Sequence, residues 1–151
     1  MILPRFYPIF DSAAWLERAL PLGVRLAQLR IKDRPPEDLR AEIRAGLRLG
    51  VSTHDRAELD RAMALAPDYV ALGPVYPTIL KQMKWREQGL DRVTEWKRLV
   101  GDTPLCAIGG MTVARAPGAF GAGADIVSAV TDITLNADPE ARMRDWLRVC
   151  A

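Results

Sequence analysis

The feature that most constrains the fold is an alternation of six short apolar segments with six helix-like segments. The apolar segments are residues 6–10, 24–30, 49–53, 69–75, 104–108 and 125–130. These segments are too short for free-standing helices and are bounded by Gly, Pro or Asp. Most of their residues are apolar on both faces, a pattern that is typical of parallel strands covered on both sides. The alternation therefore predicts an α/β fold of parallel βα units with right-handed crossovers.

Two helix-like segments begin with recognisable capping residues. Asp55 with Glu58 three residues later fits a capping box. Asp138 before Pro139 places a cap and then a proline at the first helical position. Residues 74–89 form the longest segment without periodicity. Because a loop of that length in an α/β protein is more often functional than a plain connection, we expect ligand contacts there.

Composition argues against several classes of protein. Twenty-one Lys and Arg against 19 Asp and Glu give a net charge of +2, which is too balanced for a general nucleic-acid or membrane-surface binder. No apolar run approaches the ~18–20 residues of a membrane helix. His54, Cys106 and Cys150 are the only His and Cys residues, which argues against a His/Cys metal centre and a disulfide framework. We expect one domain over residues 1–151, located in the cytoplasm.

Candidate anion-binding residues follow the second and third apolar segments. Alternation along a strand places Gln28, Arg30 and Lys32 on one face at ~6–7 Å intervals, and two cations with an amide donor suit a diphosphate. A solvated strand end is the alternative, and the spacing alone does not decide between them. Ser52 and Thr53 add hydroxyl donors beside a helix start, where helix capping is the alternative.

The last three strand ends also carry polar or small residues. The long loop contains Thr78 and Lys81, which suit an anion, although a basic surface loop is the alternative. Gly109 and Gly110 follow the fifth segment, where paired glycines let backbone N–H groups approach a phosphate or simply allow a tight turn. Ser128 adds a hydroxyl near that turn, as in the phosphate sites of eight-fold βα barrels.

Five motifs, taken in order, resemble one enzyme family. They are QLRIK (28–32), GVSTHDRAEL (50–59), DYVALGPVYPT with Lys81 (68–81), AIGGMT (107–112) and GADIVSAVT (123–131). Together they resemble thiamine-phosphate synthase and, more loosely, its relative thiazole tautomerase. The resemblance implies an eight-stranded βα barrel. It also implies a transferase of thiamine biosynthesis that joins a hydroxymethylpyrimidine diphosphate to a thiazole phosphate, releasing pyrophosphate in the presence of magnesium.

The resemblance also implies a role for each matching residue. Four residues would hold the diphosphate: Gln28, Arg30, Lys32 and Lys81. Ser52 would lie near the pyrimidine and the leaving group, and the catalytic set would be Lys81, Arg30 and Ser52. Five residues would hold the thiazole phosphate: Thr78, Gly109, Gly110, Val127 and Ser128. In such a dissociative displacement the protein mainly neutralises the leaving group and aligns the two partners.

The sequence departs from the family in its centre. The family carries a strand ending in Asn-Asp and another ending in His-Leu-Gly-Gln-Glu-Asp, whose aspartates bind magnesium. Here the only Asn is Asn136 and the only His is His54, so both motifs are absent and no metal ligands are assigned. The family's Thr-x-Thr-Lys also loses its second Thr, because residues 78–81 read Thr-Ile-Leu-Lys. About two central βα units, roughly 50 residues, are missing, which predicts a TIM-barrel-like repeat of about six units.

A barrel that has lost two units can close with six strands, stay open, or be completed by a second copy. We expect an open or distorted barrel whose unpaired strand edges favour self-association. The expected function is that of a thiamine-phosphate-synthase-type transferase with reduced turnover, which acts on two small molecules and on neither nucleic acid nor membrane. The alternatives are a thiazole tautomerase, in which His54 is the acid and base, and a non-catalytic phosphate-binding remnant.

Overall fold

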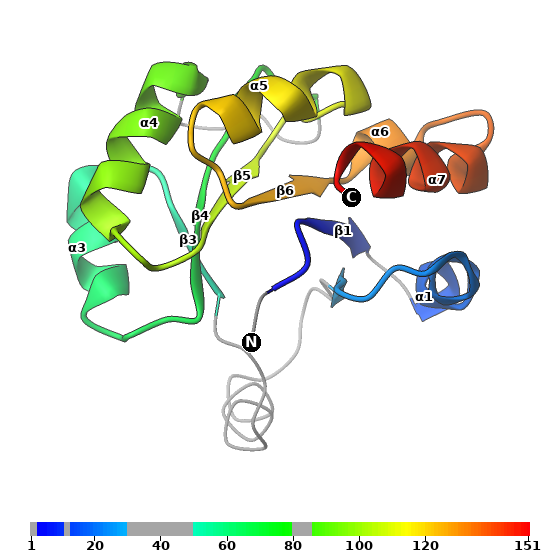
Figure 1. Ribbon diagram of the computed structural model, residues 1–151, viewed down its shortest axis with the longest axis horizontal. Helices are drawn as coiled ribbons and strands as arrows, with labels where there is room; N and C mark the ends of the chain where they lie inside the picture. Colours follow the sequence, from blue (N-terminus) through cyan, green and yellow to red (C-terminus); the bar gives the residue numbers. More distant parts are fainter. Residues whose placement is uncertain (1–2, 11–12, 30–49, 80–85) are drawn as a thin grey trace.

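The computed structural model describes residues 3–10, 13–29, 50–79 and 86–151. Within them lie six strands: β1 (Phe6–Phe10), β2 (Gln28–Leu29), β3 (Gly50–Thr53), β4 (Tyr69–Leu72), β5 (Leu105–Ile108) and β6 (Ile126–Ala129). They form one sheet in the order β2-β1-β6-β5-β4-β3 (Figure 1). Every pairing in it is parallel. The predicted parallel βα repeat is therefore confirmed.

Among the described strands, the order is that of a barrel with an opening. β1 pairs with β6, so the first strand lies beside the last, as a closed ring of strands requires. The order places β2 and β3 at opposite edges of the sheet, and these two strands do not pair with each other in the described residues. The opening thus falls between strands that are consecutive in the sequence, at the position where two units were predicted to be missing. An open barrel, as expected, agrees with this order.

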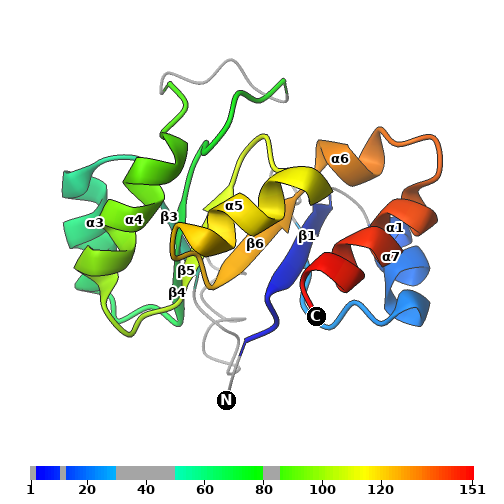
Figure 2. The same cartoon turned by 45° about the horizontal axis from the view of Figure 1, so that its top comes forward.

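Helices cover the convex face of the curled sheet. They are α1 (Ala13–Ala19), α3 (Arg56–Met63), α4 (Gly89–Val100), α5 (Ala116–Gly121), α6 (Thr131–Thr134) and α7 (Pro139–Val149), with the short 3-10 helices η1 (Leu20–Leu22) and η2 (Val113–Arg115). In Figures 1 and 2 they form an arc outside the strands, from α3 at one end to α1 at the other. No helix in the described part of the chain is long and apolar enough to cross a membrane.

Both predicted helix starts are confirmed by capping contacts. The Asp55 carboxylate accepts a hydrogen bond from the Glu58 N–H at 2.8 Å, at the start of α3. The Asp138 carboxylate accepts one from the Ala141 N–H at 2.9 Å, at the start of α7. Each contact satisfies a backbone donor that the first turn of a helix leaves unpaired.

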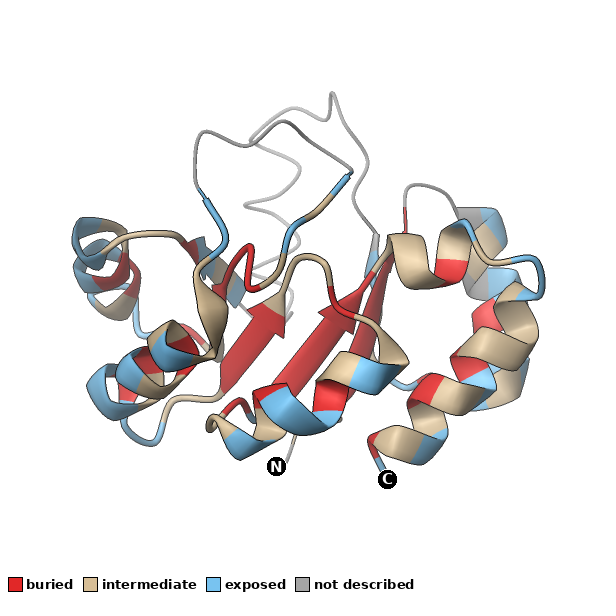
Figure 3. Ribbon diagram, turned by 90° about the horizontal axis from the view of Figure 1, so that it is seen from above, coloured by how far each residue is buried: buried red, intermediate tan, exposed pale blue. Residues whose placement is uncertain are grey.

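Buried side chains form one layer on each face of the sheet. The outer layer, between the sheet and the helices, includes Trp96 of α4 and Trp146 of α7, both fully buried. The inner layer lies on the concave face and contains Tyr7, Ile9, Ala71, Cys106 and Ile126. In Figure 3 the central strands are buried throughout, whereas the helices expose their outward sides. Both faces of the sheet are therefore apolar, as the segments that are apolar on both faces predicted.

Two predicted strands are shorter in the structure. The segment predicted at 24–30 is a strand only at Gln28–Leu29 among the described residues, because only those two residues align with β1. The segment predicted at 69–75 ends at Leu72. Pro74 has no N–H with which to continue the ladder, and the Val75 N–H instead donates to the Ile108 carbonyl at 2.8 Å. The chain after β4 is thus joined to the loop after β5.

Candidate functional site

Three of the predicted site residues share the concave face of the sheet. Paired residues on neighbouring parallel strands point their side chains to the same face. Gln28 pairs with Ile9, Ser52 with Ala71, and Ser128 with Tyr7, and all three partners belong to the inner layer. Gln28 and Ser52 are exposed and lie on the two opposite edge strands, with Ser128 between them on β6.

Ser128 has the most unusual environment of the three. It is 1% exposed, and within the described residues its Oγ is the one buried side-chain oxygen or nitrogen without a hydrogen-bond partner. An unpaired buried hydroxyl costs ~1–3 kcal/mol. A polar ligand group at the concave face would remove that cost, which supports the prediction that Ser128 contacts a ligand. Its neighbour Val127 is fully buried in the outer layer, so only the main chain of Val127 can serve a ligand on the concave face.

The paired glycines form the turn that the sequence predicted. Gly109 and Gly110 have φ angles of +92° and +61°, a region that side-chain-bearing residues avoid. A Cβ on Gly109 would lie 2.5 Å from Pro74 Cα, and one on Gly110 would lie 2.3 Å from the Pro77 carbonyl oxygen. The Tyr76 N–H also donates to the Gly109 carbonyl at 3.0 Å. The glycines are therefore required by the close packing of two loops, whether or not a phosphate binds.

An open pocket of about 260 Å³ lies between the loops that follow β4, β5 and β6. Its lining includes Thr78, Gly110, Thr112, Arg115, Thr131 and Asp132. The carboxyl ends of parallel strands are where α/β proteins bind ligands. The pocket unites two predicted residues, Thr78 and Gly110, from different loops. Gly109, Val127 and Ser128 do not line it, so the predicted phosphate set is divided between this pocket and the concave face.

Two charged residues that line this pocket, Arg115 and Asp132, were not predicted from the sequence. Asp132 accepts a hydrogen bond from Trp146 Nε1 at 2.8 Å and lies 3.8 Å from the Arg142 guanidinium, so its charge is compensated. Arg115 is half-buried and, in the described part of the chain, has no carboxylate partner. The only signal for Arg115 in the sequence is its place five residues after the glycine turn.

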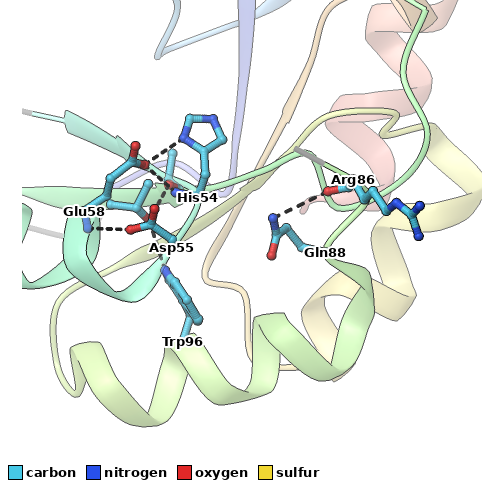
Figure 4. Close-up of polar contacts among 8 residues, drawn as sticks. His54, Asp55, Glu58, Arg86, Gln88 and Trp96 are labelled. Carbon is cyan, nitrogen blue, oxygen red and sulfur yellow. Dashed lines mark hydrogen bonds and ion pairs between the residues drawn. The ribbon is translucent and has the colours of Figure 1, made fainter. Parts of the chain in front are cut away.

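A second polar cluster lies at the carboxyl end of β3 (Figure 4). His54 Nδ1 lies 2.9 Å from Glu58 Oε2, which also accepts a hydrogen bond from the His54 backbone N–H at 2.8 Å. These contacts hold the imidazole against the first turn of α3. Thr53 was predicted as a hydroxyl donor at the helix start, and that prediction is wrong. Its buried Oγ1 donates to the Ala71 carbonyl at 3.1 Å and accepts from Trp96 Nε1 at 3.0 Å, in the outer layer.

Two titratable groups, Tyr7 and Cys106, are buried in the inner layer, and a third, Tyr69, is partly buried against it. Burial, reinforced by Cys106 and Tyr69, raises the pKa of Tyr7 above its usual value. Burial likewise raises the pKa of Tyr69. Burial raises the pKa of Cys106 to about 12, so this thiol is protonated at neutral pH and is not an activated nucleophile. The centres of the Tyr7 and Tyr69 rings lie 5.7 Å apart in an edge-to-face contact, an arrangement that aromatic pairs favour.

The described residues do not fit a magnesium site. None of them form a group of three or more His, Cys, Asp or Glu side chains able to hold a metal ion. Asp132, the carboxylate that lines the pocket, is already used by Trp146 and Arg142. The predicted diphosphate residues Arg30, Lys32 and Lys81 lie outside the described residues and stay predictions.

Comparison with known proteins shows which family the chain belongs to. The family model of thiamine monophosphate synthase matches residues 19–133. The chain is 48% identical to a thiamine-phosphate synthase of Rhizobium etli, over 100% of this chain and 97% of that protein. It is 36% identical to the thiamine-phosphate synthase of Escherichia coli K12, over 87% of this chain and 85% of that protein. A solved thiamine phosphate pyrophosphorylase from Pyrococcus furiosus has the same fold, with a TM-score of 0.80 over 97% of this chain and 95% of that one, at 19% identity.

The Rhizobium etli comparison also bears on the missing units. It extends over 198 aligned positions, whereas this chain has 151 residues, so at least 47 positions of that alignment have no residue here. That difference is close to the length of two βα units, ~50 residues. The predicted loss from the interior is therefore supported by the alignment and by the opening between β2 and β3. The chain belongs to the thiamine monophosphate synthase family.

Proposed function

We propose that this chain is a transferase of the thiamine-phosphate synthase type, which joins a hydroxymethylpyrimidine diphosphate to a thiazole phosphate and releases pyrophosphate. The observation that carries the proposal is the 48% identity to the Rhizobium etli thiamine-phosphate synthase over the whole chain. The pocket at the strand ends supports it, because Thr78 and Gly110, which come from two of the matching motifs, both line that pocket.

The thiazole phosphate would bind where the loops after β4, β5 and β6 meet. In the described residues the backbone N–H groups of Gly110 and Met111 donate to no other backbone group. Such groups, together with nearby hydroxyls, are suited to phosphate oxygens. The orphaned Ser128 Oγ would add a donor from the concave face. These elements belong to the last part of the chain, which the shortening leaves intact.

The pyrimidine diphosphate would lie against the concave face. We assign to it Gln28 and Ser52, which face that side, with Arg30, Lys32 and Lys81 as the cations predicted from the sequence. The bond between the pyrimidinyl methylene carbon and the diphosphate oxygen breaks, and both electrons leave with pyrophosphate. The thiazole nitrogen then forms the new C–N bond with its lone pair. The cations stabilise the departing charge, and the two adjacent sites align the partners.

We propose a rate well below that of a full-length relative, because the family's magnesium-binding motifs are absent. Stabilisation of a leaving group by a metal commonly contributes several kcal/mol. Since each ~1.4 kcal/mol corresponds to a factor of ten in rate, the expected reduction is at least ~100–1,000-fold. Strong magnesium-dependent turnover by the purified chain would refute this expectation and would show that other carboxylates replace the missing ones.

The proposal is tested by measuring thiamine phosphate formation from the two substrates, together with calorimetric titration of thiazole phosphate. Gly110→Asp should abolish binding, because it places a side chain and a negative charge at the turn. Gly121→Asp is the matched control, since Gly121 is exposed and a Cβ there meets nothing within 4 Å. Binding without product would indicate a non-catalytic phosphate-binding remnant. Absence of thiazole phosphate binding by the parent chain at millimolar concentration would refute the proposal.

A thiazole tautomerase is the second candidate, and the contact of His54 with Glu58 favours it. A carboxylate that holds one imidazole nitrogen orients the ring for proton transfer at the other nitrogen. Exchange of the proton of a thiazole carboxylate phosphate with solvent deuterium would detect this activity. His54→Gln should abolish the exchange if this candidate is right. Exchange that survives the substitution, or no exchange in the parent chain, would dismiss it.

Self-association and a cytoplasmic location complete the proposal. Edge strands offer unpaired backbone groups to a second chain, and in the described residues β2 and β3 are the edges of the sheet. Sedimentation at several concentrations would show a shift toward a dimer, and a mass that stays monomeric throughout would contradict it. Both cysteines of the sequence, Cys106 and Cys150, are free thiols, which is typical of a reducing compartment.

A further inference from the structure

We propose that Arg115 is a phosphate-recognition residue of the pocket described above, and that it sets the preference for a phosphorylated thiazole over the corresponding alcohol. This inference rests on the proposed function, because it assigns a residue to the same site. Neither the predicted site residues nor the matching motifs include Arg115. Its role follows from two contacts and from its uncompensated charge.

The first observation is that Arg115 joins the two loops whose packing shapes the pocket. Its Nη1 donates to the Gly110 carbonyl, in the loop after β5. Its guanidinium carbon lies 4.5 Å from the centre of the Tyr76 ring, in the loop after β4. Cations lying over aromatic faces in this way are attracted by the ring electrons. Both contacts hold the guanidinium in place before any ligand binds.

The second observation concerns the charge that remains. A guanidinium has five N–H donors, and the Gly110 carbonyl accepts from one of its nitrogens. Asp132, the acidic residue of the pocket, is paired with the Arg142 guanidinium at 3.8 Å and accepts a hydrogen bond from Trp146. Arg115 forms no ion pair in the described part of the chain, although it is half-buried. The pocket therefore keeps a fixed positive charge.

The surroundings of that charge indicate the class of ligand. Thr112 and Thr131 line the same pocket and can donate hydroxyl hydrogens. A planar guanidinium with further donors is suited to two oxygens of a phosphate at once. An uncharged alcohol cannot use the charge. Arg115 should therefore strengthen binding of a phosphate monoester dianion and leave binding of the unphosphorylated alcohol nearly unchanged.

The test is calorimetric titration of thiazole phosphate and of the unphosphorylated thiazole alcohol into the full chain. Arg115→Met keeps the aliphatic stem and removes the charge. It should weaken binding of the phosphate about 10- to 100-fold, in line with hydrogen bonds to charged groups, and change binding of the alcohol less than ~2-fold. Arg92→Met is the matched control, because Arg92 also lies over an aromatic ring, Trp96, at 4.8 Å but does not line the pocket.

The outcomes separate this inference from the proposed function. If the parent chain does not prefer the phosphate, the proposed phosphate site itself is refuted. If it does, and Arg115→Met keeps that preference or weakens both ligands equally, the role of Arg115 in recognition is overturned. Should the Met variant not fold, Arg115→Lys carries the test. The lysine variant should lose several-fold affinity for the phosphate alone, because it keeps the charge without the planar fork, and equal loss for both ligands would again overturn the inference.

Discussion

Replacing Gly110 by alanine tests how the two loops of the pocket pack together. Gly110 has a φ of +61°, and the left-handed region costs a residue with a Cβ roughly 1–2 kcal/mol. The new Cβ would also lie 2.3 Å from the Pro77 carbonyl oxygen and 2.8 Å from that of Tyr76, both of them backbone atoms. These atoms can give way only if the loops separate. Separation of the loops would weaken two backbone hydrogen bonds, from the Val75 N–H to the Ile108 carbonyl and from the Tyr76 N–H to the Gly109 carbonyl.

The expected loss is the sum of these effects. Weakening two neutral hydrogen bonds at ~0.5–1.5 kcal/mol each costs about 1–3 kcal/mol. Added to the conformational cost of roughly 1–2 kcal/mol, this should lower the free energy of unfolding of Gly110→Ala by roughly 2–5 kcal/mol. Gly23→Ala is the control, because Gly23 has a φ of +93° but a Cβ there meets nothing within 4 Å. It should cost only roughly 1–2 kcal/mol. Urea unfolding curves measure both, and equal losses would refute the packing of these loops.

Three further predictions concern buried groups. Ser128→Ala should raise the free energy of unfolding by about 1 kcal/mol, because it removes a buried hydroxyl without a hydrogen-bond partner. The same substitution should weaken thiazole phosphate binding. A loss of stability instead would mean that the hydroxyl has a partner. Trp96→Phe should cost ~1–2 kcal/mol in urea unfolding through the lost bond to Thr53, and more than Trp15→Phe, whose ring is only partly buried. Burial raises the pKa of the Cys106 thiol from 9.0 to about 12 in the folded chain. As pH rises, the unfolded chain therefore loses this proton before the folded chain does, and the free energy of unfolding should fall between about pH 9 and 12. A thermal midpoint that stays constant over this range would contradict the last prediction.

The positions of the strands were predictable because they depend on local pattern. The segment 6–10 is a strand over its whole predicted length. The start at Gly50 has a steric reason as well, since a Cβ there would lie 2.0 Å from the Tyr69 ring. Short apolar runs bounded by Gly or Pro leave few alternatives for where a buried strand can begin and end. Strand ends that depend on tertiary pairing, such as that of β2, were less predictable.

The chemistry of individual side chains was predictable only where a motif indicated it. Thr53 was expected to be a donor at a helix start, but its hydroxyl bonds to Trp96, 43 residues away in the sequence. The sequence did not indicate Arg115 as a site residue, because its position in the pocket depends on contacts with Tyr76 and Gly110 that only the fold creates. Contacts between distant segments leave no local spacing in the sequence, so the face and the partner of each side chain had to come from the structure.

The strand order explains how a member of this family can lack two βα units while the rest of its sheet stays paired. In a ring of parallel strands each strand is bonded only to its two neighbours, so removing two adjacent units leaves unpaired only the strands that bordered them. In the described sheet these are β2 and β3, and the continuous run through β1, β6, β5 and β4 is untouched. The loops after β4, β5 and β6 form the pocket, and they lie within that run. We therefore expect the shortening to affect phosphate binding at the pocket less than it affects departure of the diphosphate. Two of the proposed diphosphate contacts, Gln28 and Ser52, lie on the edge strands β2 and β3.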